Sequence, residues 1–324
     1  SEWPKWETVM NADPVDPSAL LIDAGTGDER EIARNRPLTR PRPGHADLPG
    51  MLSYDLSEAR PVLERASARE TAARVALGAL AEALLDQVAG IRLVSHVVAV
   101  GAQRASASTI PTPADEEALC EASMRTLDTA DNARFEAAVD EAKHAGDTIG
   151  GVVEVIAYGV PVGLGTHVTA RERLDARLAT ALMSIQSVKG VEIGDGFAQA
   201  ALLGSAAHDE IVRGADGHLT RTTNHAGGIE GGTSNGAPIV ARAGFKPIST
   251  VPRALRSVDL ATGEEAVGLH QRSDTCQVVP GAVIAEAEVA LVLADALFDH
   301  AGGRSVAEMR RNLSSYLEVV GERA

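Results

Sequence analysis

The spacing of apolar positions along the chain predicts several long helices. In residues 59–88, apolar side chains recur near helical intervals, and Pro61 suits a first helical turn. Near the C-terminus, residues 281–298 are apolar on most faces, which predicts a buried helix. The predicted helices cover residues 59–88, 132–145, 173–189, 281–298 and 304–320.

Shorter segments between these helices have β-strand character, because they are rich in β-branched residues or alternate in polarity. The predicted strands cover residues 91–100, 150–160, 190–193 and 238–245. Residues 1–58 are rich in Pro, Gly and Asp and predict a loop-rich segment, and the Ser, Thr, Pro and acidic residues of 104–131 predict an exposed excursion. Long helices mixed with β segments indicate a layered α/β or α+β fold. Since no linker divides the chain, we expect a single domain over residues 1–324.

Charge and composition narrow the possible functions. The 45 acidic residues exceed the 30 basic residues, which gives a net charge of −15 and disfavours binding to nucleic acid or to an anionic membrane. Acidic residues interrupt the apolar stretch at 283–298, so no membrane span is expected. The two cysteines, Cys120 and Cys276, form no disulfide framework, and the default location is a reducing cytoplasm.

Basic residues gather in two nearby motifs, RPRPGHAD at residues 40–47 and RASARET at 65–71. Neither motif offers the arginines obvious acidic partners, so together they predict a pocket for a small ligand with several negative charges. Within this pocket, His45 has small neighbours and could donate a proton to a departing phosphate. A surface loop histidine is the alternative interpretation.

The second basic motif places Arg65 and Arg69 four residues apart on one predicted helix face, with Ser67 in the same turn. Such a face suits a phosphate or carboxylate. The alternative is a solvated face on which Glu64, Glu70 and Arg74 form ion pairs.

Two later motifs also carry candidate chemistry. KPIST at residues 246–250 offers an ammonium and two hydroxyl groups to a phosphate-bearing cofactor, although it could equally be a plain exit from a strand. QRSDTC at 271–276 places Arg272 and Asp274 on the same side of an extended segment, either for proton transfer beside a bound anion or as a surface ion pair. The glycine clusters at 146–151 and 227–236 fit neither nucleotide-binding fingerprint, and no metal motif is present.

The order of these motifs along the chain resembles the chorismate synthase family, essentially from end to end. The matching segments are RPGHAD (42–47), RASARETAARVA (65–76), GDTIGG (146–151), QSVKGVEIGDGF (186–197), NHAGGIEGGTSNG (224–236), KPIST and QRSDTC. The resemblance implies a lyase of the shikimate pathway, in aromatic amino acid biosynthesis. It converts 5-enolpyruvylshikimate 3-phosphate to chorismate and phosphate by a 1,4-elimination that needs reduced FMN without net redox change.

The resemblance also implies an α+β fold, a β-α-β sandwich with long central helices between antiparallel sheets, assembled as a homotetramer. No NAD(P)H-binding domain is visible, so we expect an external flavin reductase to supply reduced FMN. By the same resemblance, Arg42, Arg69 and Arg272 bind substrate anions, and His45 serves the leaving phosphate as acid or fixed charge. Asp274 assists removal of the C6 proton. The implied FMN contacts are Arg65, Ala66, Ser67, Gln186, Ser187, Gly231, Lys246, Pro247, Ile248, Ser249, Thr250 and Arg272.

One departure from the family pattern affects the expected activity. The chain contains no GESHG motif, whose histidine is the second catalytic imidazole of the family, so we expect an N-terminally truncated chain with reduced or no activity. Two other interpretations stay open from the sequence. One is a scaffold that binds FMN or an anion without turnover, and the other is a phosphate-ester enzyme that uses no flavin.

Overall fold

The computed structural model describes residues 37–106, 110–215, 217–268 and 273–321. These residues belong to two compact units rather than to the single domain expected from the sequence. The smaller unit comprises Ser1–Ser67 and Ala254–Gln271, and the larger unit comprises Ala68–Arg253 and Arg272–Ala324.

The larger unit is built on a five-stranded sheet in the order β2-β1-β3-β9-β4, with every neighbouring pair antiparallel. The other sheets of the described residues have two strands each. Together with the helices, these antiparallel sheets confirm the predicted α+β class. The strands of the main sheet are β1 (Arg92–Val100), β2 (Gln103–Arg104), β3 (Gly151–Tyr158), β4 (Val188–Ile193) and β9 (Ile239–Phe245).

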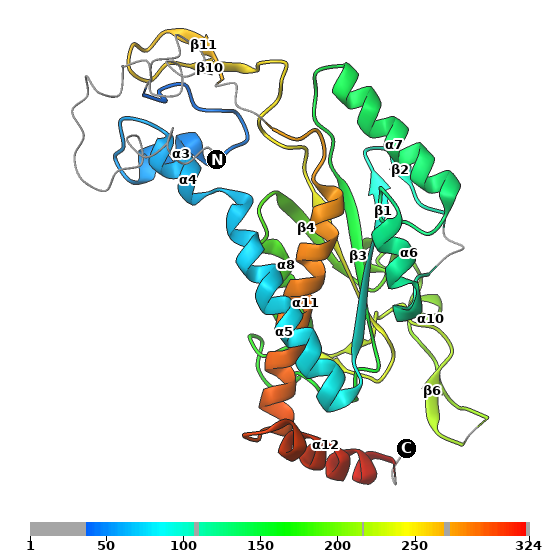
Figure 1. Cartoon of the computed structure of the whole chain (residues 1–324). Helices are drawn as coiled ribbons and strands as arrows, with labels where there is room; N and C mark the ends of the chain where they lie inside the picture. Colours follow the sequence, from blue (N-terminus) through cyan, green and yellow to red (C-terminus); the bar gives the residue numbers. More distant parts are fainter. Residues whose placement is uncertain (1–36, 107–109, 216, 269–272, 322–324) are drawn as a thin grey trace. The chain divides into compact units, whose positions relative to one another are not determined.

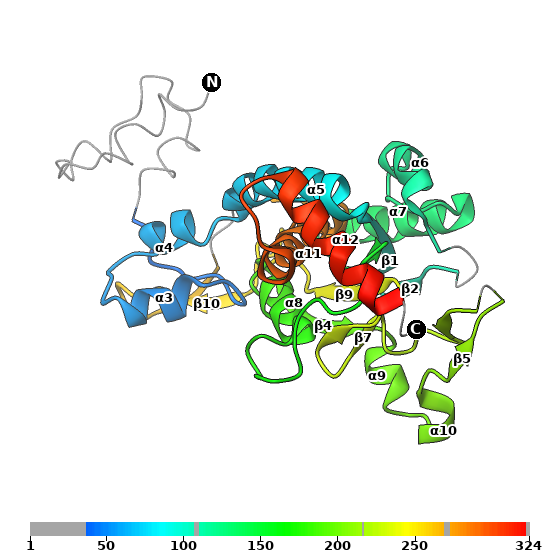
Figure 2. The ribbon, with the colours of Figure 1, turned by 90° about the horizontal axis from the view of Figure 1, so that it is seen from below.

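Three helices, α5, α8 and α11, pack on one face of this sheet, and α5 and α11 run side by side (Figures 1 and 2). Gly90 ends α5 in the left-handed region, at φ 69°, where its N–H bonds to the carbonyl oxygens of Asp86 and Leu85. The helices of the larger unit are α5 (Thr71–Ala89), α6 (Glu116–Glu121), α7 (Thr129–His144), α8 (Leu174–Met183), α9 (Gly196–Gln199), α10 (Gly204–Ala207), α11 (Val278–Ala301) and α12 (Val306–Gly321), with 3-10 turns η2 (Ala68–Glu70) and η3 (Pro113–Asp115).

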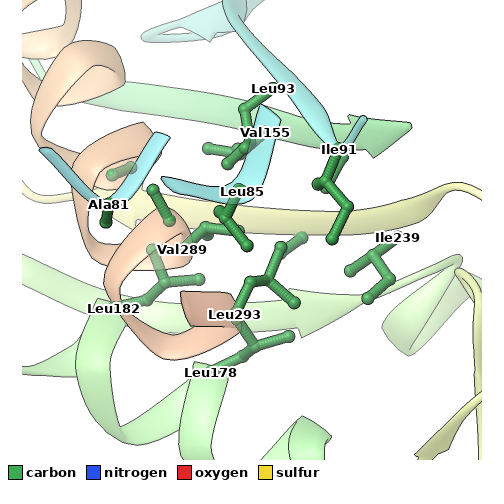
Figure 3. Packing of buried hydrophobic residues seen from close by; sticks show 14 of the residues in the cluster. Ala81, Leu85, Ile91, Leu93, Val155, Leu178, Leu182, Ile239, Val289 and Leu293 are labelled. Atoms are coloured by element: carbon green, nitrogen blue, oxygen red, sulfur yellow. The ribbon is translucent and has the colours of Figure 1, made fainter. Parts of the chain in front are cut away.

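The main core lies between these helices and the sheet (Figure 3). Strand β3 alternates as half-covered strands do: Val153 and Val155 face the helices, whereas Glu154 lies on the opposite face. Figure 3 shows side chains from α5 (Ala81, Leu85), α8 (Leu178, Leu182), α11 (Val289, Leu293) and the strands (Leu93, Val155, Ile239) meeting in this layer. Burial of this apolar surface is the main stabilising contribution to the unit.

Residues 203–236, which are rich in polar residues and glycine, form two small hairpins. They are β5 (Ile211–Arg213) with β6 (Leu219–Arg221), and β7 (Ile229–Glu230) with β8 (Thr233–Ser234). The segment 104–131, expected to be an exposed excursion, contains α6, whose Leu119 is fully buried against Val94 and Ile156. No helix in the described ranges is long and apolar enough to cross a membrane.

The prediction of one continuous helix over residues 59–88 is wrong in one respect, because the helix is interrupted. Helix α4 ends at Arg65, η2 follows, and α5 begins at Thr71. Serine favours helix ends because its hydroxyl competes for local backbone hydrogen bonds, and Ser67 lies in this break. Arg65 and Arg69 therefore do not share one helix face.

The described residues of the smaller unit form a much smaller core than those of the larger unit. Among its described residues, Leu38, Met51 and Ala59 form a buried apolar cluster, with partly buried Leu56, Val62 and Leu63 around them. A backbone hydrogen bond of 2.9 Å from Leu260 N to Thr39 O joins its two chain segments. Its elements are α3 (Asp47–Ser53), α4 (Arg60–Arg65), β10 (Arg256–Val258) and β11 (Glu265–Val267).

Candidate functional site

Segments of four of the sequence motifs meet at one edge of the larger unit, where β3 and β4 begin and β9 ends. The Thr148 hydroxyl donates to the carbonyl oxygen of Ile248 at 2.7 Å, and Ile149 N donates to Thr275 O at 2.9 Å. Lys246 N donates to Ser187 O at 2.9 Å. We call this region the motif edge, made of residues 146–151, 186–187, 246–250 and 273–276. Antiparallel pairing of β9 with β3 and β4 thus brings together segments about a hundred residues apart.

A lysine in this region is poised for an anion. Lys246 is half-buried, and burial together with the nearby positive charge of Lys189 lowers its pKa. A bound phosphate or carboxylate would offset both effects, because a nearby negative charge stabilises the ammonium form.

Gln186 supplies a polar atom that has no partner. Its Oε1 is buried, and no hydrogen-bond partner for it lies in the described part of the chain. Its amide nitrogen donates to Glu70 Oε1 at 2.5 Å, and Glu70 in turn pairs with Arg74 at 2.8 Å. These contacts bring the start of α5, and with it the exposed Arg69, to the motif edge. Orphaned buried acceptors are uncommon and often mark a ligand position.

Ser187 has a φ of 71°, in the left-handed region that non-glycine residues rarely adopt. The backbone around it is fixed by the bond from Lys246 N, so the conformation is held by the sheet. Such outliers cluster at ligand sites.

The remaining candidates of the larger unit fall in different places. Asp274 is exposed at the motif edge, where the Ile149–Cys276 bridge holds its segment. Gly231 lies at the other end of α8, where Leu174 N bonds to Gly232 O, about 15 Å from the end that Gln186 follows. The structure does not bring Gly231 to the motif edge within the chain. Arg272 lies outside the described residues.

In the smaller unit, a tight turn positions His45. His45 N donates to Arg42 O at 3.2 Å, Pro43 occupies the second position and Gly44 the third, with a φ of 77°. This is the pattern of a type II turn, in which proline presets the second residue and glycine tolerates the left-handed third position. The sequence RPGH therefore dictates the local structure that presents the imidazole.

Asp47, two residues beyond His45, is fully buried and accepts several hydrogen bonds. The donors are Arg42 N (3.0 Å), Arg42 Nε (2.8 Å), Arg42 Nη2 (3.0 Å) and His45 Nδ1 (2.5 Å). Burial acts to raise the pKa of Asp47, but the hydrogen bonds from His45 and Arg42 outweigh it and hold the pKa well below its usual range. The expectation that these arginines lack an acidic partner is wrong for Arg42. The partner stands in the RPGHAD motif itself, and the signal was its spacing two residues after the histidine.

The residues Arg65, Ala66 and Ser67 also belong to the smaller unit. Arg65 is the last residue of α4 and is exposed, and the other two lie half-buried in the chain that follows. Arg42, His45 and these three residues are thus carried by one unit. Arg69, Gln186, Ser187, Lys246–Thr250 and Asp274 are carried by the other.

A hollow of about 820 Å³ lies on the sheet face opposite α5, α8 and α11, and none of the predicted site residues lines it. Across its floor His96, Glu154 and Arg242 stand opposite one another on β1, β3 and β9. His96 Nε2 lies 2.9 Å from Glu154 Oε1, and Arg242 Nε donates to Glu154 Oε2 at 2.6 Å. Burial raises the pKa of Glu154, but these two partners outweigh burial and lower it. The sequence signal was an ionisable residue at the outward position of each of these predicted strands.

Comparison with known proteins identifies the family to which this chain belongs. A sequence profile described as "Chorismate synthase" matches residues 2–298. The chain belongs to the chorismate synthase family. The chorismate synthase of Beutenbergia cavernae is 61% identical over 323 residues, covering 99% of this chain and 79% of the relative. That of Mycolicibacterium vanbaalenii is 56% identical over 323 residues, covering 100% and 78%.

A solved structure titled "Crystal Structure of Chorismate Synthase" has the same fold, with a TM-score of 0.72 and 37% identity. The match covers 86% of this chain and 77% of that chain. All the motifs that carried the resemblance lie inside the range matched by the chorismate synthase profile.

Proposed function

We propose that this chain is a lyase that converts 5-enolpyruvylshikimate 3-phosphate to chorismate and phosphate by a 1,4-elimination, with reduced FMN as cofactor. Family membership over residues 2–298 supports the reaction. The structural observation that carries the proposal is the motif edge, where Gln186, Lys246 and the segment of Asp274 lie together.

The residues of the motif edge fit FMN. The orphaned Oε1 of Gln186 can accept an N–H of the flavin ring, and the ammonium of Lys246 with the hydroxyls of Ser249 and Thr250 suits its phosphate. When bound, reduced FMN supplies an electron-rich ring to the substrate. Ser187, Pro247 and Ile248 would complete the binding segment. Arg65, Ala66, Ser67, Gly231 and Arg272 stay proposed contacts by family resemblance.

The chain's own side chains have three tasks in the elimination. Arg42, Arg69 and Arg272 bind the substrate's anions. Asp274 assists departure of the C6 proton. His45 donates a proton to the leaving phosphate or stabilises its negative charge with a positive one.

Anaerobic phosphate release from 5-enolpyruvylshikimate 3-phosphate, with added reduced FMN, tests the proposal. We expect release that depends on flavin and that falls about 10²- to 10⁴-fold in His45→Ala. His208→Ala is the matched control, because His208 is an exposed histidine at the end of α10. Release without flavin, or flavin binding with no release, would contradict the proposal.

We further propose that the protein works as a cytoplasmic homotetramer supplied with reduced FMN by a separate flavin reductase. The support is family resemblance, with free Cys120 and Cys276 in keeping with a reducing compartment. Light scattering of the purified chain would measure the assembly, and a mass other than four chains would contradict it.

A further inference from the structure

An ion pair at the start of α5 fixes the position of one carboxylate. Arg74 Nε donates to Glu70 Oε2 at 3.0 Å, and Arg74 Nη2 lies 2.8 Å from Glu70 Oε1. Nη1 of the same guanidinium donates to Ser184 Oγ at 2.7 Å and to Glu288 Oε1 at 3.0 Å. The guanidinium is therefore held by α8 and α11, and it holds the carboxylate of Glu70 in a bidentate geometry.

That carboxylate determines how the side-chain amide of Gln186 is oriented. A carboxylate paired with a guanidinium is ionised and only accepts hydrogen bonds, so the group of Gln186 that lies 2.5 Å from Glu70 Oε1 must be its NH2. If the amide were reversed, two oxygens would face each other at this distance. The contact with Glu70 therefore leaves Gln186 Oε1 as an acceptor directed elsewhere.

The backbone on both sides of Gln186 is fixed as well. Ile185 N donates to Leu182 O at 3.2 Å, and the left-handed Ser187 accepts from Lys246 N at 2.9 Å. The amide oxygen is buried, and the described part of the chain offers it no donor. A buried acceptor without a donor is unfavourable, so a ligand that brings an N–H to this oxygen would be favoured.

We propose that Glu70 is a positioning residue for the flavin, which fixes the amide of Gln186 so that Oε1 accepts an N–H of the flavin ring. The inference rests on the FMN site proposed above for the motif edge. An amide that could turn would offer its NH2 as readily as its oxygen. With Glu70 in place, Gln186 offers only the acceptor, which pairs with a ring N–H and not with a ring carbonyl.

A purely structural role for Glu70 is the competing explanation. In that role the carboxylate would tie the start of α5 to the loop after α8, without selecting either atom of the amide. The two roles differ when Gln186 loses its amide. A positioning residue then has nothing to orient, whereas a structural contact would still affect the site.

Equilibrium binding of FMN, followed by quenching of flavin fluorescence, separates the two roles without any turnover. We expect Glu70→Gln, whose amide can donate as well as accept, to raise the Kd about 3- to 10-fold, the range for one hydrogen bond. Gln186→Met removes the acceptor at similar side-chain length and should raise the Kd at least as much. In the double variant the Kd should equal that of Gln186→Met alone.

Asp86→Asn is the matched control. Asp86 lies at the other end of α5 and pairs with Arg92 at 3.5 Å, with both side chains exposed. This substitution should leave the Kd unchanged.

Nitrogen-15 NMR of bound reduced FMN, labelled at the ring nitrogens, reports the hydrogen bond directly. We expect the proton signal of one ring N–H to lie further downfield in wild type than in Gln186→Met, because a hydrogen bond to the amide oxygen deshields it. Glu70→Gln should move the same signal part of the way. These measurements are made at saturating flavin, so weaker binding in a variant does not affect them.

Three results would overturn the inference. In the first, the effects of the two substitutions on the Kd multiply in the double variant, so that Glu70 acts independently of Gln186. In the second, Gln186→Met weakens binding but Glu70→Gln does not. In the third, FMN binds, yet neither substitution changes the Kd and no N–H signal moves. That third result rejects only this inference, whereas a wild-type chain that binds no FMN would reject the proposed cofactor as well.

Discussion

Acidic side chains surround the buried Arg125 in the larger unit. The Arg125 guanidinium donates to Glu116 at 2.9 Å and to Glu286 at 3.2 Å, while its Nε donates to Ser95 O at 2.9 Å. Glu82 lies in the same neighbourhood. Its burial, followed by the negative charges of Glu286 and Glu116, raises its pKa to about 7. The single positive charge of Arg125 therefore cannot neutralise all three carboxyl groups near it, those of Glu82, Glu116 and Glu286.

The raised pKa of Glu82 predicts a loss of stability as the pH rises. The folded state holds the proton more tightly than the unfolded chain, so the free energy of unfolding falls between about pH 4.3 and pH 7. We expect Glu82→Gln to flatten this dependence and to stabilise the protein by about 1–2 kcal/mol at pH 8, since partial exposure reduces the full effect. Denaturant unfolding across pH would measure it, with Glu117→Gln, an exposed position on α6, as control. An unchanged slope in Glu82→Gln would contradict the assignment.

At the scale of elements, a row of side chains across the sheet, His96, Glu154 and Arg242, joins β1, β3 and β9 in addition to the backbone bonds. Glu154 is 6% exposed and accepts from both His96 and Arg242. Cross-strand pairs of this kind also fix the register, because a slip of one residue would move Glu154 into the apolar core.

Removing the charge of Glu154 should be costly. We expect Glu154→Gln to lower the free energy of unfolding by about 2–3 kcal/mol, because it leaves Arg242 and His96 without their anion in a buried position. Urea unfolding measures the change. The control is Glu265→Gln, whose pair with Arg256 spans 3.6 Å with both side chains almost fully exposed, and no measurable change is expected there. Equal effects in the two variants would contradict the special role of the row.

Helices α5 and α11 approach closely because small residues face each other. A Cβ added at Gly78 would lie 2.4 Å from Cβ of Ala287. We expect Gly78→Ala to destabilise the protein by about 1 kcal/mol or more, since overpacking outweighs the gain in helix propensity. Gly321→Ala on α12, where nothing lies within 4 Å, should be neutral or slightly stabilising. Thermal unfolding compares them, and a stabilised Gly78→Ala would show that the helices can separate without cost.

At the scale of the molecule, the described residues of the two units differ greatly in how much apolar surface they bury. The smaller unit buries Leu38, Met51 and Ala59, whereas the larger unit has a continuous core between the sheet and its helices. Regions with few buried apolar contacts open at lower free energy.

Hydrogen exchange should therefore separate the units. We expect amides of α3 and α4 to exchange faster than those of β3, β9 and α11, because opening the small core costs less. Met51→Ala should accelerate exchange in the smaller unit alone. Uniform protection across both units would contradict this expectation.

The elements of the larger unit followed largely from local patterns. Alternation in residues 238–245 and β-branched residues in 91–100 predicted β9 and β1, and the apolar stretch at 281–298 predicted the buried α11. The break at Ser67 was not predicted, because the apolar periodicity continues across it although the α-helical conformation is interrupted there. The contacts of Asp47 with Arg42 and His45 were missed for a different reason. A sequence motif gives the type of each residue but does not show which side chain is buried away from water.

The sequence by itself determined the α+β class, the positions of the main strands and helices, the turn at RPGH and membership of the chorismate synthase family, because each depends on local spacing or on the order of motifs. Only the tertiary structure decided that Thr148, Ile248 and Thr275 meet at one edge, that Gln186 keeps an unpartnered oxygen there, and that Glu154 joins His96 to Arg242. These features depend on pairing between segments far apart in the chain and on the water that burial removes, and neither is written in a local pattern.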